Sequence, residues 1–160
     1  MTKLVIHVPH ASTAIPEDVW SEFTVSRQDV EAEAVASADL YTGEMARQAW
    51  PHAEIIETEV SRIVVDVERY DDDTSEEMAE VGRGVMYTCD HLMRPIREAL
   101  SGPRREELLA RHYRPHWKRL QTQAANAILV DLHTYPAEPW PIERHAHGPR
   151  PEIDIGFSEG

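Results

Sequence analysis

Two short apolar runs near opposite ends of the chain constrain the fold more than any other feature. The first is KLVIHV (residues 3–8), which Pro9 closes, and the second is AILVDLH (residues 127–133), which the breaker-rich TYPAEPWP follows. Continuous runs with many β-branched residues are typical of strands that are covered on both faces of a sheet. We therefore predict that both runs form central strands.

Three other segments also have strand character. They are AEIIETEV (residues 53–60), SRIVVDVERY (residues 61–70) and EIDIGF (residues 152–157). Each is short, rich in β-branched residues or alternating in polarity, as half-buried strands are. We predict a strand in each of them.

Helical patterns separate these strand candidates. Apolar residues recur at helical spacing from Gln28 to Trp50, which predicts a helix there. A second helix should begin at Ser101, with Pro103 in its first turn, and Pro115 should kink or interrupt it. Strands that alternate with helices predict an α/β domain with a mixed, mostly parallel sheet and helices on both faces.

The size and charge of the chain exclude several classes of protein. Its 160 residues suit one domain, and its net charge of -13 disfavours binding to nucleic acids or to anionic membranes. Cys89 is the only cysteine, and no apolar stretch approaches the ~20 residues that span a bilayer. We expect a cytoplasmic protein, we expect the acidic run at residues 71–77 to be a solvated loop, and homo-oligomer formation stays open.

Two histidines stand at the ends of the two apolar runs. In open α/β sheets, ligands bind beyond the carboxyl ends of the strands. His10 lies just past the first run and His133 ends the second, so the two imidazoles would meet if the strands are neighbours. Catalytic zinc often takes two histidines, a carboxylate and a water. The alternative is that each histidine merely ends a strand, and His7, inside the first strand, is assigned a structural or ligand-supporting role.

Aspartates and arginines could complete such a site. Asp39 lies one residue off the apolar stripe of its predicted helix. It could be the third metal ligand, or it could be an ordinary solvent-exposed residue. Asp131 is placed to hold an imidazole through its second ring nitrogen, or is simply a buried, hydrogen-bonded aspartate. Arg62 and Arg69 could orient an acidic substrate through a bidentate fork, or form surface salt bridges.

Six segments, taken in order, resemble the N-formylglutamate amidohydrolase family over nearly the whole chain. They are HVPHASTAIP, ASADLYTGEMA, VSRIVVDVERYDDDTSEEMAEVGRGVMYT, HYRPHWKRL, LVDLHTYP and RPEIDIG. The third segment is long and distinctive, and the ordered series is more specific than any single element. The resemblance makes residues 1–160 one domain of this family, short at its C-terminus.

This resemblance implies a fold, an activity and a set of site residues. The fold would be a three-layer α/β/α, phosphorylase/hydrolase-like domain, similar to the zinc carboxypeptidases and aspartoacylases. The activity would be metal-dependent removal of formate from an N-formylated acidic amino acid at the end of histidine breakdown. By the same resemblance His10, Asp39 and His133 would bind Zn²⁺ or another divalent metal, and Arg62 or Arg69 would bind the substrate carboxylate.

The sequence departs from the family pattern in two places. Trp117 stands where the family commonly has a histidine, and we place the neighbouring His116 among the substrate-binding candidates. The family's catalytic glutamate lies past the last matched segment, so the general base is unknown, with Glu68, Glu77 and Asp154 available. Two other readings therefore stay open: a related zinc amidase or carboxypeptidase-like hydrolase for another N-acyl amino acid or peptide, and an inactive metal- or ligand-binding remnant.

Overall fold

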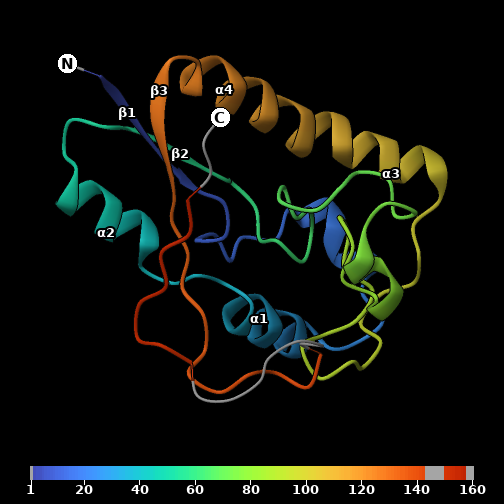
Figure 1. Cartoon of the computed structure of the whole chain (residues 1–160). Helices are drawn as coiled ribbons and strands as arrows, with labels where there is room; N and C mark the ends of the chain where they lie inside the picture. Colours follow the sequence, from blue (N-terminus) through green and yellow to red (C-terminus); the bar gives the residue numbers. More distant parts are fainter. Residues whose placement is uncertain (1, 143–149, 158–160) are drawn as a thin grey trace.

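Three parallel strands form the sheet in the computed structural model, which describes residues 2–142 and 150–157. The strands are β1 (Lys3–Val8), β2 (Glu54–Glu57) and β3 (Ala127–Asp131), and they lie in the order β2–β1–β3. His7 of β1 pairs with Asp131 of β3. Because all three strands run in the same direction, their carboxyl ends meet at one edge of the sheet (Figure 1).

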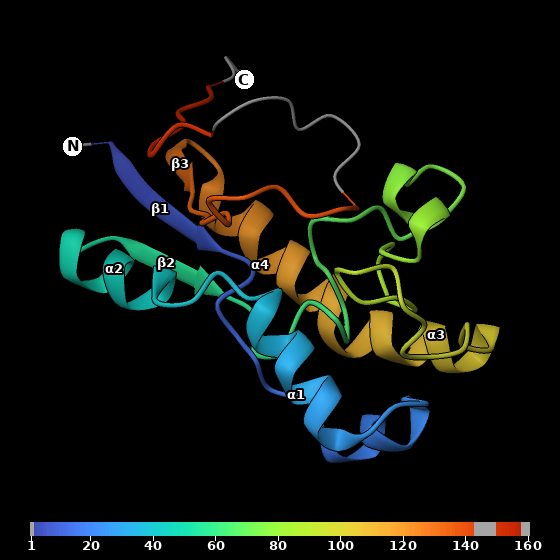
Figure 2. The same cartoon turned by 90° about the horizontal axis from the view of Figure 1, so that it is seen from below.

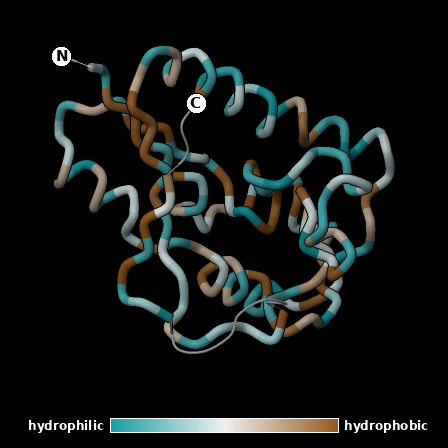
Figure 3. The backbone as a smooth tube through the Cα atoms, in the orientation of Figure 1, coloured by the Kyte–Doolittle hydropathy of each residue, from teal (hydrophilic) through white to brown (hydrophobic). Residues whose placement is uncertain are grey.

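Helices cover both faces of this sheet, as Figures 1 and 2 show. On one face, Val5 and Ile56 pack against Leu120 of α4 (Arg114–Ala124). On the other face, Ile6 and Val8 pack against Ala46 of α2 (Thr42–Ala49). Figure 3 shows the hydrophobic residues of the strands between these helices. The predicted α/β architecture, with helices on both faces of a sheet, is confirmed.

The N-terminal helical prediction is correct in type but wrong in continuity. Instead of one helix from Gln28 to Trp50, the chain forms α1 (Arg27–Ala36) and α2, separated by five residues. Ser26 caps α1 by accepting a hydrogen bond from the amide of Asp29. Tyr41 then takes a left-handed backbone conformation (φ 69°) at the start of α2, which helical spacing alone does not reveal.

The second helical region contains the predicted interruption. It comprises α3 (Gly102–Leu108), a π-helical turn η3 (Leu109–Tyr113) and α4, with Pro115 in the first turn of α4. Proline lacks an N–H group and its ring clashes with the preceding turn, so the helix widens to a π-turn just before it. Within the described residues, no helix is long and apolar enough to cross a bilayer.

Three strand predictions are wrong. Residues 61–70 form turns in place of a strand, because Val64 bonds back to Ser61 and the β-branched side chains pack into an irregular core. Residues 152–157 form no strand, and Ile153, Ile155 and Phe157 are exposed.

The third wrong prediction concerns the place of the last strand. In the described chain β3 is an edge strand and not a central one, so Ile128 and Leu129 are 56% and 44% exposed. An apolar sequence indicates that a strand can be buried, but it does not identify the strands or helices that bury it.

Residues 58–101 connect β2 to the second helical region without forming an α-helix or strand. The short 3₁₀-helix η2 (Glu77–Val81) is the one helix in this fully described stretch. A second 3₁₀-helix, η1 (Glu17–Glu22), lies between β1 and α1, and its Val19 belongs to the same core cluster as Ile63 of this stretch. The acidic run is exposed from Asp71 to Ser75, as predicted, whereas Glu76 is buried and caps η2 through the amide of Met78.

Candidate metal centre

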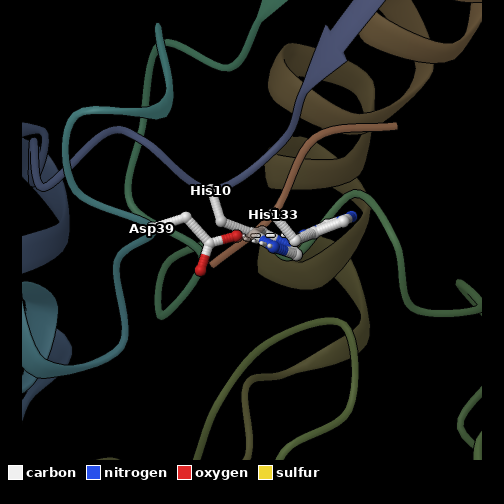
Figure 4. Close-up of side chains that lie close together, drawn as sticks. All are labelled: His10, Asp39 and His133. Atoms are coloured by element: carbon white, nitrogen blue, oxygen red, sulfur yellow. Dashed lines mark hydrogen bonds and ion pairs between the residues drawn. The ribbon is translucent and has the colours of Figure 1, made fainter. Parts of the chain in front are cut away.

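Three predicted ligands come together at the carboxyl edge of the sheet. His10 follows β1 by two residues and His133 follows β3 by two residues, so the parallel strands deliver both imidazoles to one place. Asp39 lies in the connection between α1 and α2, and its backbone amide donates to the carbonyl of His10 at 2.9 Å. Figure 4 shows the three side chains facing one another.

The Nδ1 atoms of both imidazoles converge on one carboxylate oxygen. Oδ2 of Asp39 lies 2.9 Å from Nδ1 of His133 and 3.5 Å from Nδ1 of His10. His10 is 1% exposed, and its Nδ1 is buried without a hydrogen-bond partner in the structure. A buried imidazole nitrogen with no partner is costly, and a cation beside it would satisfy its lone pair.

Carboxylates lie at the opposite nitrogens of both rings. Nε2 of His10 contacts Asp66 at 2.8 Å and Glu68 at 3.5 Å. Nε2 of His133 contacts Glu68 at 3.2 Å and Asp131 at 3.3 Å. We call Nδ1, which faces Asp39, the inner nitrogen of each ring and Nε2 the outer nitrogen. A carboxylate beside the outer nitrogen keeps a proton on it and leaves the lone pair of the inner nitrogen for a metal ion. The outer carboxylates therefore favour the tautomer in which Nδ1 binds a metal.

Asp66 is the most strongly held of these carboxylates. It is fully buried and accepts two hydrogen bonds from Arg62, one from the hydroxyl of Tyr87 at 2.7 Å, and one from the amide of Glu68. Burial alone would raise the pKa of Asp66, but the positive charges of Arg62 and His10 hold it well below its usual range. Asp66 thus stays ionised and fixed in front of His10.

The charge balance of the centre is negative. Burial would lower the pKa of His133, but hydrogen bonds to Asp131, Asp39 and Glu68 raise it to about 12. For Asp39, burial is likewise outweighed, because the two imidazoles hold its pKa well below the usual range. Such shifts mark a place where carboxylates outnumber the fixed positive charges, and a divalent cation would compensate that excess.

The donor set fits zinc. Two imidazole nitrogens and one carboxylate oxygen converge, as in catalytic zinc sites that keep a fourth position for water. The ligand atoms of His10, Asp39 and His133 all lie within 4.8 Å of one another. The partnerless Nδ1 of His10 and the carboxylates behind both rings are the structural observations that support this fit.

The two predicted arginines have different surroundings. Arg62 donates two hydrogen bonds to Asp66, from Nε at 3.0 Å and from one terminal nitrogen at 2.8 Å. Arg69 makes longer contacts, with Asp66 at 3.7 Å and with Glu76 at 3.6 Å, and its buried Nε has no hydrogen-bond partner. The Arg69 side chain is also 26% exposed, so its guanidinium has more capacity for a ligand than that of Arg62.

A second pair of histidines lies on the α4 face of the sheet. Nδ1 of His7 is 2.9 Å from Asp131, and Nε2 of His7 is 2.8 Å from Nε2 of His116 on α4. Burial and the neighbouring charge of His7 lower the pKa of His116 to about 4. Trp117, beside His116, donates to the carbonyl of Val67 at 2.8 Å.

The carboxylates considered as general bases are dispersed. Glu68 reaches the centre, Glu77 lies exposed at the start of η2, and Asp154 lies in the exposed segment 150–157. Asp66 and Tyr87 also belong to the centre, although neither was predicted from the sequence. An aspartate inside an apolar run, as in IVVDV, was the available sign that a buried charge has a special partner.

Comparison with known proteins assigns a family and supports the fold. A sequence model of the N-formylglutamate amidohydrolase family matches residues 2–160. No curated protein matches the chain. An N-formylglutamate amidohydrolase from Ralstonia eutropha JMP134 has a similar structure, with a TM-score of 0.71 and 19% identity over 85% of this chain and 55% of that chain.

A gene product of Agrobacterium tumefaciens is similar to the same degree. Its TM-score is 0.67, with 19% identity over 84% of this chain and 52% of that chain. At this identity the two structures support the fold alone. The chain spans about half the length of the solved structures that it matches.

Proposed function

The chain belongs to the N-formylglutamate amidohydrolase family, and we propose on this premise that it hydrolyses the amide of an N-formylated acidic amino acid, such as N-formylglutamate, at a zinc ion. His10, Asp39 and His133 would hold the ion. The observation that carries the proposal is the convergence of two Nδ1 atoms on Oδ2 of Asp39, one of them buried without a partner.

The residues of the chain would divide the work as follows. A bound zinc ion would supply Lewis acidity that activates water and polarises the formyl carbonyl. Asp66 would hold the outer nitrogen of His10, while Glu68 and Asp131 would hold that of His133. These contacts fix the ring orientations, so that both inner nitrogens stay aimed at one point.

Arg69 is our candidate for binding the substrate's carboxylate. Its buried Nε has no hydrogen-bond partner, and its contacts with Asp66 and Glu76 are longer than hydrogen bonds. A guanidinium fork matches a carboxylate in a bidentate manner. We assign Arg62 instead to Asp66, because two of its nitrogens already donate there.

Zinc content and formate release test the proposal together. Zinc-loaded wild-type protein should release formate from N-formylglutamate. His10→Ala and His133→Ala should each lose at least one equivalent of bound zinc and reduce formate release to background. The matched control is His52→Ala, which replaces an exposed histidine in a turn and should change neither quantity.

Three results would contradict the proposal or favour one of the alternatives. Unchanged zinc content in both histidine variants would overturn the metal centre. Zinc binding without turnover of any N-acyl amino acid would support the reading of the chain as an inactive metal-binding remnant. Release of another acyl group, with formyl substrates left intact, would support the related amidase.

A further inference from the structure

A second group of ligand-type side chains lies at the Nε2 side of His133, opposite the nitrogen that faces Asp39. It consists of His7, Glu68 and Asp131, whose ligand atoms all lie within 4.8 Å of one another. His7 and Asp131 are paired residues on β1 and β3, so the sheet register fixes their spacing. Glu68 reaches them from the irregular segment that follows β2.

The spacing of these atoms suits a metal ion. Nδ1 of His7 lies 2.9 Å from Oδ1 of Asp131, which lies 3.3 Å from Nε2 of His133. Oε1 of Glu68 lies 3.2 Å from the same nitrogen. Ligand atoms at ~2.0–2.1 Å from a tetrahedral zinc ion are about 3.3–3.4 Å apart. Of the three proposed ligand atoms, those of His7 and Asp131 are 2.9 Å apart, somewhat less than this edge length, and all three lie within 4.8 Å of one another, so small side-chain movements would bring them to the spacing of a metal site.

His116 lies within hydrogen-bond distance of the second ring nitrogen of His7. Their Nε2 atoms lie 2.8 Å apart, a distance at which one ring donates a proton to the other. When His7 is the donor, its Nδ1 carries a lone pair that points toward Asp131. In that arrangement His116 supports the orientation of the His7 ring by accepting its Nε2 proton.

Charge and access also favour a cation. Glu68 and Asp131 both contact the same nitrogen of His133, so two carboxylates share one small region. In the described part of the chain, no lysine or arginine forms an ion pair with either carboxylate. Their side chains are 25% and 47% exposed, which gives an ion a path from solvent.

We propose that His7, Glu68 and Asp131 bind a second divalent transition-metal ion, back to back with the first and with the imidazole of His133 between them. One imidazole and two carboxylates suit ions such as Zn²⁺ or Mn²⁺. The inference deepens the proposed function, because it adds a cation to the same centre, but it rests on different ligands and can fail independently.

Counting bound zinc in the wild type, three variants and one control tests this inference. Metal-free wild-type protein, equilibrated with buffered Zn²⁺ and measured by elemental analysis, should bind two equivalents. His7→Gln should bind one and Asp39→Asn should bind one, because each variant removes a ligand of a different site. The double variant should bind none at the same free zinc concentration. His52→Gln is the matched control and should bind two.

Each other result has a definite meaning. One equivalent in the wild type that Asp39→Asn loses and His7→Gln keeps would overturn the second site and leave the proposed function standing. One equivalent that His7→Gln loses and Asp39→Asn keeps would support the second site and overturn the proposed zinc centre. Two equivalents retained in His7→Gln would also overturn it. If His7→Gln does not fold by circular dichroism, His7→Asn gives the same test, because it also removes the imidazole of His7 and leaves every residue of the first centre in place.

Discussion

The sheet and the irregular region of residues 58–101 both contain fully buried apolar residues, but their backbone polar groups find hydrogen-bond partners in different ways. Val5, Ile6 and Val8 of β1 are 0% exposed, and so are Ile63 and Val64 of the irregular region. In the sheet, the N–H and C=O groups bond to neighbouring strands in a regular ladder. In residues 58–101 such ladders are absent, apart from isolated bridges. Other groups must therefore form hydrogen bonds with the buried N–H and C=O groups.

Polar side chains form these hydrogen bonds with the buried backbone. Arg97 is 3% exposed and donates to the carbonyls of Tyr87 and Ile63, both at 3.0 Å. Asp66 accepts from the amide of Glu68 in the same way. The sheet therefore supplies histidines at its edge, whereas the irregular region brings buried charges, and one of these charges orients a histidine.

A matched pair of core substitutions would test whether the two regions are equally well packed. Ile6→Ala in the sheet and Ile63→Ala in the irregular region both remove a fully buried side chain. Each should lower the free energy of unfolding by about 2–5 kcal/mol, through lost burial and the cavity that remains. Urea denaturation of both variants would give the two values side by side.

The control for this pair is Ile153→Ala, whose side chain is 78% exposed and whose effect should stay within about 0.5 kcal/mol. If Ile63→Ala costs as little as this control, the irregular region is loosely packed, and the comparison with the sheet fails.

A substitution at Asp66 would test whether the irregular region acts on the metal centre. Asp66→Asn keeps the size of the side chain, but its amide group faces donors from Arg62, Tyr87 and His10. His10 would be held less well, so zinc affinity should fall by about 10–100-fold. Competition with a chromophoric chelator would measure this affinity without relying on activity.

Asp71→Asn is the matched control, because Asp71 is exposed in the acidic loop. It should leave zinc affinity unchanged. An affinity of Asp66→Asn equal to that of the wild type would show that the position of His10 is set by the sheet alone.

The same contrast explains what the sequence could predict. The apolar runs predicted strands at β1 and β3, and the alternation of strands with helices predicted a mostly parallel sheet. His10 and His133 were expected to meet if these strands are neighbours, and the structure shows that they are. The run at residues 61–70 has the same composition, yet it turns at residues 62–64. Its β-branched residues can also pack in an irregular core when buried polar side chains form hydrogen bonds with the backbone. The periodicity of the sequence does not reveal such side chains.

The position of Asp39 shows a second limit. Helical spacing placed it within one long helix, but it lies in the break before α2. The break depends on the left-handed conformation of Tyr41 and on the bond from the Asp39 amide to the His10 carbonyl, which is a contact between distant parts of the chain. Asp66 was missed for the same reason, because its role is visible only when its distance to His10 is known.

A turn in the irregular region offers the smallest test of how side chains replace a ladder. The side chain of Asp90 accepts hydrogen bonds from the amides of Leu92 and Arg94 and from Nε of Arg94. Burial would raise the pKa of Asp90, but these bonds lower it below 3.8. A lowered carboxyl pKa adds stability above pH 3.8, and that stability is lost as the pH falls below 3.8 through the folded-state value.

Asp90→Asn should therefore lower the free energy of unfolding by about 1 kcal/mol at pH 7, because the charge that strengthens these bonds is gone. The difference from the wild type should narrow as the pH falls below 3.8, since the wild-type carboxylate is then protonated too. Urea unfolding of both proteins at neutral and acidic pH measures this, with Asp154→Asn in the exposed segment 150–157 as the control. A difference that stays constant with pH would mean that the charge of Asp90 does not contribute to the stability of this turn.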